Sequence, residues 1–582
     1  MSNNNNENEE NEENKFSLKI EKVDLNPDRN IYENTLRRKY SKEDIVNLYF
    51  EDITEFKILS WENKLFESKL SIHDFSNITD SDILNEKYND TKMLKIINGD
   101  IERTRVQESI YMPSFKDYTF QIIIYYLNHN NINYKQGLNE IAGPFVLLKY
   151  KLKLSLTRIY KLFVCFIDKF LTNYFHEIEF FSLKSTFSLI NILLRYHDPQ
   201  LFYKFEYCMV IPDLYATSWI MTLFSNKCSL NITYYLWDKL ILFDDNLFPI
   251  FFITSFIIKN RNQFFKADSS VILTILSQLE IKEKDEINEL LNLSNEIRDK
   301  TPNSFYLLSN KLEIFKYDSL KLEMSYNKYK PGKLLALPMF AQDIFCITHK
   351  NVIGCPDEKC ENFKNVKFNN NTKCIYCRNK QFKKKISFII LDLRLFKNDN
   401  KDKISDSYPG ILPKTLRISN EQLNDEKYPE NILNEYKEEK DNYHFIIITS
   451  ETKNFEEYEK EFYKDIEKDK KKRHSKLGVI FKKTRELNMK KVNEKFKEND
   501  KNYLLLKEFD NFKKLIDGMN KEGFKYVSFV YGGYELIHYY AKQYKIDLLE
   551  HGKECTLCKK QFKRSSSFFN FNILKNKIKF NI

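Results

Sequence analysis

The chain has 582 residues, of which 93 are basic and 82 are acidic, and its formal net charge is +11. This length allows two to four domains with a sizeable core. The basic residues are interleaved with acidic ones almost everywhere. Nucleic-acid-binding proteins gather their positive charge on one face or stripe, so this pattern argues against a nucleic-acid partner.

Three features bear on the compartment. The first residues, 1–14, are mostly Asn and Glu and lack the apolar region of a secretory signal. The longest mostly apolar run, residues 247–258, is too short to span a bilayer and predicts a buried helix. The 10 cysteines include two CxxC pairs, which favour metal binding in a reducing compartment over disulfides. We therefore expect a cytoplasmic protein without a transmembrane segment.

The N-terminal half divides into a tail and a helical domain. Residues 1–40 are too polar to fold alone, so we expect them to be disordered. Residues 41–316 consist of amphipathic segments of helical length separated by short polar loops, which predicts an all-α domain. A capping box at 114–117 would start one of these helices. The clearest helical segments are 115–127, 138–148, 154–175, 182–196 and 230–242.

Residues 335–553 change character. Short β-rich runs at 386–392, 445–449 and 526–531 alternate with helical patterns, which predicts an α/β domain with a parallel sheet. Two insertions interrupt it, and a C-terminal tail follows. These segments are the cysteine-rich insertion 355–377, the Lys- and Glu-rich insertion 456–510, which we expect to be solvated or partly helical, and the tail 554–582. The chain is thus expected to be multidomain, all-α and then α/β.

Two short motifs flank the first predicted helix. They are residues 97–104 (INGDIERT) and residues 134–139 (YKQGLN). An arginine supplied in trans can neutralise the charge on a transferring phosphoryl group, and a carboxamide can orient the attacking water. The pair therefore offers what a protein needs to complete the GTPase site of another protein.

Within these motifs, Arg103 and Gln136 are the candidates for the two catalytic groups. Asp100 lies close enough in sequence to orient the guanidinium of Arg103 by a charge-assisted hydrogen bond. A glycine at 137 lets the backbone beside Gln136 approach a nucleotide without a Cβ in the way. The supporting residues are Asp100, Tyr134, Gly137 and Asn139.

The order IxxDxxR, helix, YxQG resembles the TBC domain of Rab GTPase-activating proteins. Further matches are Lys57–Trp61 in place of the family's RxxxW motif, with lysine for arginine, and the segments Ile211–Trp219 and Leu236–Asp238. The resemblance covers roughly residues 50–265 and implies that Arg103 and Gln136 are the two fingers of a dual-finger mechanism. It also implies a Rab-family small GTPase as the partner. That partner carries the Mg-GTP, so activation needs no cofactor of this chain's own.

The second domain resembles a rhodanese domain. The matching segments are 388–394 (FIILDLR), 409–412, 445–449 and 530–534. In that family a nucleophilic cysteine opens the loop after a later strand, but here the loop 449–453 reads Thr-Ser-Glu-Thr-Lys. Persulfide chemistry needs a thiolate, so we expect no sulfurtransferase activity and a scaffold or partner-binding module instead.

A TBC domain followed by an inactive rhodanese-like domain resembles the group typified by TBC domain family member 23 and, more distantly, TBC-containing kinase-like proteins. The resemblance implies vesicle traffic, with peripheral association to Golgi or endosomal membranes through golgins or other vesicle-tethering proteins. Two functions stay open: a Rab GTPase-activating protein, or a catalytically inactive trans-Golgi and endosome tethering adaptor. Animal members of the group have lost the finger residues, and this chain has kept them, which favours the first.

Cysteine pairs indicate metal sites. Two pairs in the first insertion can place four thiolates around one structural Zn²⁺, although unligated loop cysteines are the alternative. These residues are Cys355, Cys360, Cys374 and Cys377. Near the C-terminus, Cys555 and Cys558 form a single knuckle with His551 nearby, but no partner pair is obvious.

Overall fold

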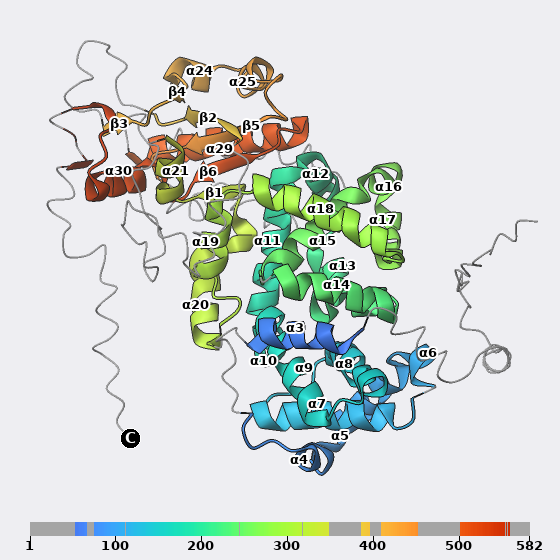
Figure 1. Ribbon diagram of the computed structural model, residues 1–582. Coiled ribbons are helices and arrows are strands. Elements are labelled where there is room, and N and C mark those ends of the chain that lie inside the picture. Colours follow the sequence, from blue (N-terminus) through green and yellow to red (C-terminus); the bar gives the residue numbers. More distant parts are fainter. Residues whose placement is uncertain are drawn as a thin grey trace, which may run out of the picture. The chain divides into compact units, whose positions relative to one another are not determined.

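The computed structural model describes residues 53–66, 75–110, 112–243, 245–316, 318–348, 386–395, 409–451, 501–552, 555, 557 and 558. The chain divides into two compact units, Met1–Glu51 and Asp52–Ile582, and the second contains all of these residues. The predictions for 1–40, for the cysteine-rich insertion and for most of the charged insertion and the tail lie outside them. Within the second unit a helical region precedes an α/β region (Figure 1).

The helical region confirms the all-α prediction. Its described residues, from 53 to 333, contain no strand beyond an isolated bridge between Cys228 and Ile281. The helices are α3 (Glu55–Phe66), α4 (Asp80–Leu84), α5 (Thr91–Arg103), α6 (Val106–Ser109), α7 (Phe115–Asn130), α8 (Leu138–Leu152), α9 (Leu156–Phe170), α10 (Thr172–His176), α11 (Phe181–His197), α12 (Pro199–Tyr207), α13 (Pro212–Thr222), η1 (Ser225–Lys227), α14 (Leu230–Phe243), α15 (Phe248–Lys259), α16 (Arg261–Lys266), α17 (Ser269–Gln278), α18 (Lys284–Lys300), α19 (Asn303–Lys311), α20 (Ser319–Tyr329) and η2 (Pro331–Lys333).

Local sequence explains several helix starts. The Asp90 carboxylate accepts hydrogen bonds from two backbone amides in the first turn of α5, and Asp198 caps α12, where Pro199 follows. The predicted capping box at Ser114 is wrong. Ser114 has φ 59°, a left-handed conformation, and its side chain makes no capping bond, although α7 still begins at Phe115. A side-chain cap requires an extended backbone at that position.

Three tryptophans anchor the helical core. Trp61, Trp219 and Trp237 are almost fully buried. The indole N–H of Trp61 donates to Asp238 Oδ1 at 2.8 Å, and the Lys57 ammonium lies 3.8 Å from Oδ2 of the same carboxylate. These contacts fix α3 against α14. The apolar run 247–258 forms most of α15, whose residues from 248 to 257 are buried, which confirms the predicted buried helix.

The α/β region is built on a five-stranded sheet with the order β1-β6-β5-β2-β4. Every neighbouring pair in it is parallel, which confirms the prediction from the alternating pattern. Its strands are β1 (Leu337–Met339), β2 (Ser387–Asp392), β4 (Thr415–Arg417), β5 (Tyr443–Ile448) and β6 (Val527–Val530). Two further strands, β3 (Pro409–Ile411) and β7 (Leu549–His551), pair antiparallel in a separate two-stranded sheet.

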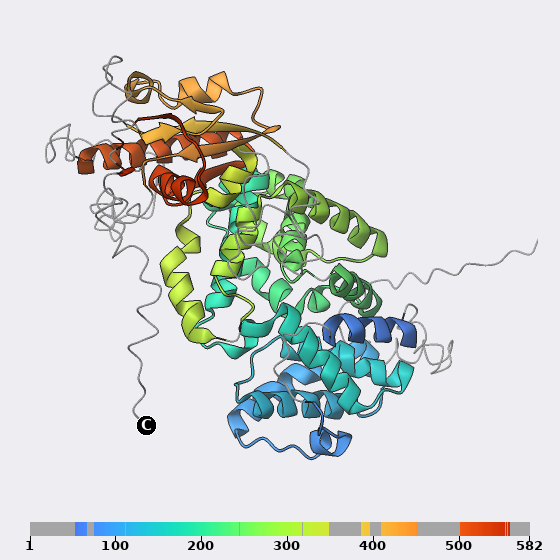
Figure 2. The same cartoon turned by 60° about the vertical axis from the view of Figure 1, so that its left-hand side comes forward.

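One face of the sheet packs on helices. The helices of this region are α21 (Ala341–Thr348), α24 (Asn420–Asn424), α25 (Glu430–Glu435), α29 (Lys501–Glu522) and α30 (Gly533–Tyr544). Leu391, Phe445 and Phe529 share one hydrophobic core with α24, α25 and α29, and Figure 2 shows the long helix α29 running along the sheet. The predicted insertion 456–510 therefore extends too far, because α29 begins at Lys501. The many Lys and Glu residues at 501–510 suggested a solvated segment. Its apolar residues nevertheless recur at helical spacing and pack in the core.

The helical and α/β regions touch directly. The backbone N–H of Tyr526, just before β6, donates to the carbonyl of Tyr196 on α11 at 2.7 Å. The Tyr196 ring meets the rings of Tyr526 and His444 edge-on. Arg195, also on α11, donates to the Leu334 carbonyl at 2.6 Å. Over the part of the chain described above, none of the helices is both long and apolar enough to cross a membrane.

Candidate functional site

The first predicted finger, Arg103, is the last residue of α5. Ile97, Asp100 and Ile101 face the interior of the helical region, and Thr104 ends the helix in an extended conformation. The Arg103 side chain is 73% exposed, whereas Asp100 is buried. The helix thus holds a charged side chain at its end, available to a partner.

Asp100 connects the arginine to the second motif. Nη2 of Arg103 donates to Asp100 Oδ1 at 2.6 Å, the contact expected from their spacing. The Tyr134 hydroxyl donates to Asp100 Oδ2 at 2.9 Å and also lies 3.0 Å from Oδ1 of Asn139. Burial and the neighbouring carboxylate raise the pKa of Tyr134 well above its ordinary value, so this hydroxyl keeps its proton. A buried carboxylate therefore binds one residue from each motif.

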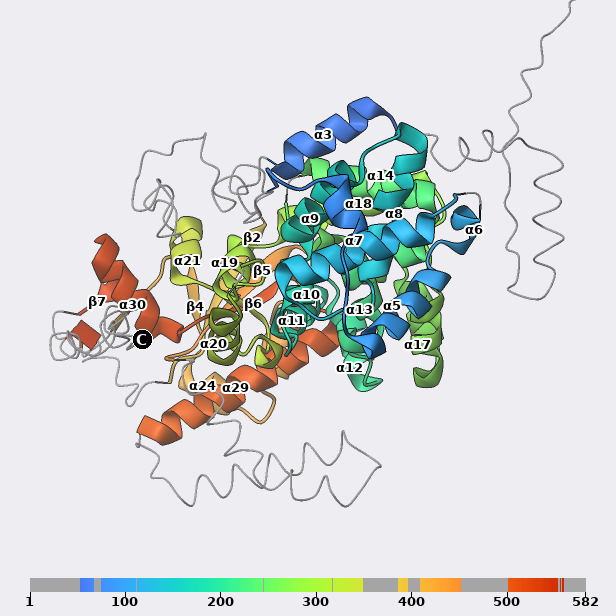
Figure 3. The same cartoon turned by 90° about the horizontal axis from the view of Figure 1, so that it is seen from below.

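Asn139 closes the network. Its Oδ1 accepts the backbone N–H of Gly137 at 3.1 Å, and its Nδ2 donates to Oγ1 of Thr104 at 2.7 Å. Gln136, the second predicted finger, is exposed and lies in the turn immediately before α8. The end of α5 and the turn before α8 are consequently tied together by buried hydrogen bonds. Figure 3 shows α5, α7 and α8 packed side by side.

The two neighbours of Gln136 fix its backbone. Gly137 has φ 106°, and a Cβ there would lie 3.4 Å from Cβ of Met221 on α13. Lys135 donates to the carbonyls of Tyr174, at 3.0 Å, and of Glu177. Burial lowers the pKa of Lys135 to about 8. The turn is thus held on both sides, and glycine is needed here for its positive φ.

Sequence reasoning missed the role of a second arginine close by. Arg105 has φ 47°, and its side chain is almost fully buried. Its guanidinium donates to the carbonyls of Ser225, at 2.5 Å, and Cys228, at 3.0 Å, and to Oγ1 of Thr233 at 3.0 Å. Arg105 therefore ties the segment after α5 to the start of α14, and the residue type alone gave no signal of this difference from Arg103.

In the α/β region, the loop after β5 holds no thiol in its described part, Thr449–Glu451. The carboxylate of Glu508, on α29, accepts two hydrogen bonds from this loop. The donors are the Ser450 N–H, at 2.8 Å, and the Ser450 hydroxyl, at 2.7 Å. The carboxylate also accepts the Leu395 N–H at 2.9 Å. Burial, with a smaller contribution from the charge of Asp392, raises the pKa of Glu508 to about 7. A buried carboxylate from α29 thus binds the backbone and the hydroxyl of Ser450 in this loop.

Asp392 and Arg394, in the segment FIILDLR, form a buried ion pair at the end of β2. Arg394 donates to both oxygens of Asp392 at 2.6 to 3.1 Å and to the Gly410 carbonyl at 3.0 Å. Its guanidinium lies 3.6 Å from the centroid of the Tyr534 ring. The pair thus joins β2, β3 and α30. The predicted zinc ligands Cys355, Cys360, Cys374 and Cys377 lie outside the described residues.

Several curated proteins share part of this sequence. Three TBC domain-containing protein kinase-like proteins, from Gallus gallus, Mus musculus and Homo sapiens, are each 29% identical over 116 residues, covering 20% of this chain and 13% of theirs. The Dictyostelium discoideum protein of the same description is 27% identical over 146 residues, covering 25% of this chain and 14% of its own. The chain thus matches only a small part of the length of these relatives.

A solved structure also aligns with the chain. It is the crystal structure of the Ypt/Rab-GAP domain of Gyp1p, with 19% sequence identity and a TM-score of 0.35. The alignment includes 95% of that structure and 46% of this chain. The sequence pattern of the Rab-GTPase-TBC domain matches residues 56–265, which include both motifs of the site. Residues 56–265 of this chain are therefore a TBC domain.

Proposed function

We propose that this chain accelerates GTP hydrolysis by a Rab-family small GTPase, with Arg103 and Gln136 supplied in trans. Intrinsic hydrolysis is slow because the water is poorly placed and negative charge builds up without support. An arginine finger raises the rate by roughly 10³ to 10⁵. In this role Arg103 stabilises the transferring phosphoryl group and Gln136 positions the water, while the GTPase provides the nucleotide and Mg²⁺.

The buried network around Asp100 is the observation that supports this proposal. It leaves both finger residues exposed, yet it fixes the backbone that carries each of them. Groups held in place before the partner arrives lose little entropy when the transition state forms, which is how positioning lowers a barrier. The Asp100 carboxylate binds Arg103 directly and binds Tyr134, two residues before Gln136, so one buried group holds both exposed residues near each other.

Single-turnover GTP hydrolysis across a panel of Rab proteins tests the proposal. We expect one or more of them to respond to the wild type, and Arg103→Ala and Gln136→Ala each to remove most of the acceleration. Arg417→Ala is the control, because Arg417 is exposed on β4 in the α/β region. The proposal fails if no Rab responds, or if both finger variants keep the wild-type rate.

The α/β region supports a second candidate function, binding without catalysis. We propose that it is a rhodanese-like scaffold that binds other proteins, as a vesicle-tethering adaptor at Golgi or endosomal membranes would. The support is the loop after β5, where the buried Glu508 carboxylate accepts hydrogen bonds from the Ser450 N–H and hydroxyl and the described residues offer no thiol. We expect no sulfur transfer from thiosulfate to cyanide above the protein-free rate. A measurable turnover would overturn this part of the proposal.

A further inference from the structure

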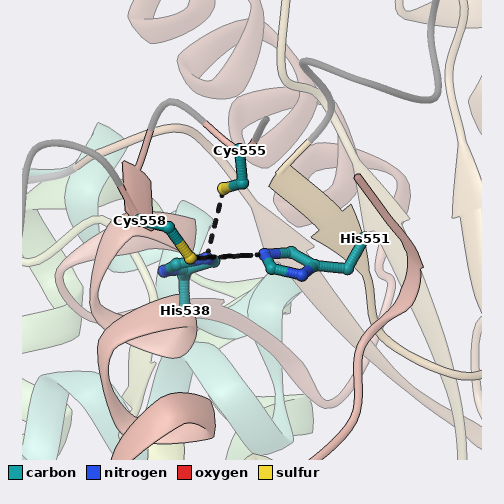
Figure 4. Close-up of side chains that lie close together, drawn as sticks. All are labelled: His538, His551, Cys555 and Cys558. Atoms are coloured by element: carbon teal, nitrogen blue, oxygen red, sulfur yellow. Dashed lines mark hydrogen bonds between the residues drawn. The ribbon is translucent and has the colours of Figure 1, made fainter. Parts of the chain in front are cut away.

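Four potential metal ligands meet at one edge of the α/β region (Figure 4). They come from three segments that are separate in the sequence: His538 from α30, His551 from β7, and Cys555 and Cys558 from the segment that follows. Their ligand atoms all lie within 4.8 Å of one another. The spacing is His-x12-His-x3-Cys-x2-Cys, and only its last three members stood out in the sequence.

The distances between these atoms match those around a single tetrahedral ion. Nε2 of His538 lies 3.1 Å from Nε2 of His551, 3.4 Å from Sγ of Cys555 and 3.6 Å from Sγ of Cys558. Sγ of Cys558 lies 3.7 Å from Nε2 of His551. Zinc bond lengths and tetrahedral angles give about 3.4 Å between two nitrogens and about 3.6 Å between nitrogen and sulfur.

Hydrogen bonds within the group do not account for this arrangement. Nε2 of a neutral imidazole carries either one proton or one lone pair, so it can make one good hydrogen bond. Nε2 of His538 nevertheless approaches three other ligand atoms at once. A cation at the centre satisfies all four atoms together.

We propose that His538, His551, Cys555 and Cys558 bind one Zn²⁺ as a structural site. Thiolate and imidazole are the ligands that Zn²⁺ takes in Cys₂His₂ sites, and four protein ligands leave no position open for a substrate. Two thiolates and two neutral imidazoles bring the total charge of the site to zero. This suits its burial, since Cys555 and His538 are almost fully buried.

The zinc would fasten the two-stranded sheet to the rest of the α/β region. Strands β3 and β7 have three residues each, and His551 pairs with Pro409 at one end of the ladder. Such a short pair is not stable by itself in water. The ion would join β7 to α30, and β3 is already held by the hydrogen bond from the Tyr534 hydroxyl to Pro409. The site would therefore stabilise the surroundings of Arg394, which donates to Gly410 in β3 and lies over the Tyr534 ring of α30.

Zinc content of the full-length protein gives the first test. We expect Cys558→Ser and His551→Asn each to lower the zinc content by one ion per chain, whatever the cysteine-rich insertion binds. These two positions are chosen because Cys558 and His551 are the less buried members of the group. Cys208→Ser is the control, since Cys208 is also partly exposed but lies in the helical region. Unchanged zinc in both folded variants would overturn the proposal.

A second measurement uses the wild type and does not depend on the variants folding. Alkylation of the intact protein, resolved by peptide mapping, reports each cysteine separately. We expect Cys558 to react slowly in the zinc-loaded protein and at least tenfold faster after a zinc chelator is added, because the bound thiolate is not free to attack. Cys208 should react at the same rate in both states. Equal rates for Cys558 with and without the chelator would overturn the proposal.

Discussion

Arg103 and Arg105 stand two positions apart in the chain but face different surroundings. The first is 73% exposed and makes one ion pair with Asp100, while the second is buried among backbone carbonyls. A motif identifies an arginine by position, whereas its environment decides whether it serves a partner or the fold. We therefore expect substitution of Arg103 to affect catalysis and substitution of Arg105 to affect stability.

We expect Arg103→Ala to abolish most of the acceleration of GTP hydrolysis while leaving the unfolding temperature close to that of the wild type. The Arg103 side chain is 73% exposed, and the buried Asp100 carboxylate keeps the hydrogen bond from the Tyr134 hydroxyl when the arginine is removed. Arg105→Ala should instead lower the free energy of unfolding by about 3 kcal/mol, because it leaves buried acceptors without a donor. Thermal unfolding and single-turnover hydrolysis, measured on the same preparations, check both. The assignment is wrong if the two substitutions exchange their effects.

Glu508 predicts a pH dependence of stability. Its pKa is about 7 in the folded protein and would be near 4.5 in the unfolded chain, so the folded state holds this proton more tightly. The stabilisation is therefore complete below the unfolded pKa and is lost as pH rises through the folded pKa. It amounts to roughly 3 kcal/mol.

The variant Glu508→Gln lacks this titration. We expect the difference in unfolding free energy, wild type minus variant, to fall between pH of about 5 and about 8. Urea unfolding at both pH values measures it. Glu421→Gln serves as the control, because that side chain is exposed on α24. A difference that stays constant with pH would show that Glu508 is not buried as a carboxyl group with a raised pKa.

At the scale of elements, the turn before α8 depends on one glycine. We expect Gly137→Ala to destabilise the protein by about 1 to 3 kcal/mol, because an L side chain is strained at this positive φ. Gly99→Ala is the matched control within α5: a Cβ there meets nothing within 4 Å. It should stabilise the protein by about 0.5 to 1 kcal/mol, since alanine favours a helix interior. Thermal unfolding measures the loss of stability in Gly137→Ala and the gain in Gly99→Ala. A Gly137→Ala protein as stable as the wild type would show that the turn does not need glycine at this position.

Periodicity predicted the elements better than local signals did. The segments at 138–148 and 230–242 correspond to α8 and α14, and the three β-rich runs became three strands of the sheet. The start of α29 was missed because charged residues surround its apolar positions. His538 was missed as a ligand because the end of α30 and strand β7 separate it from Cys555 in the sequence, and only the fold brings them together.

The candidate site was predictable for a related reason. Asp100 and Arg103 lie one helical turn apart, so their contact follows from spacing, and Tyr134, Gly137 and Asn139 lie in one short segment. The hydrogen bonds that join the two segments, through Thr104 and Asp100, depend on tertiary packing and could not be read from the sequence.

At the scale of the whole molecule, the contact of Tyr526 with α11 makes the two regions dependent on each other. The Tyr526 ring is buried and lies 5.4 Å from that of Tyr196 and 5.7 Å from that of His197, measured between centroids. Burial, with smaller contributions from Lys300 and Lys525, lowers the pKa of His197 to about 3, so this ring is neutral when it packs. An aromatic cluster thus links α11 to the sheet, and each region loses buried surface if the other unfolds.

We therefore expect the wild type to unfold in a single transition in urea. Tryptophan fluorescence reports the helical region alone, because the chain has 3 tryptophans and all lie there, and alkylation of the buried Cys555 reports the α/β region. Tyr526→Ala should remove about 3 kcal/mol of packing and split the two signals into separate transitions. Tyr436→Ala, which removes a ring that packs on Phe445 inside the α/β region, should lower stability but keep the signals together. If the signals separate already in the wild type, the two regions fold independently and the contact through Tyr526 does not couple them.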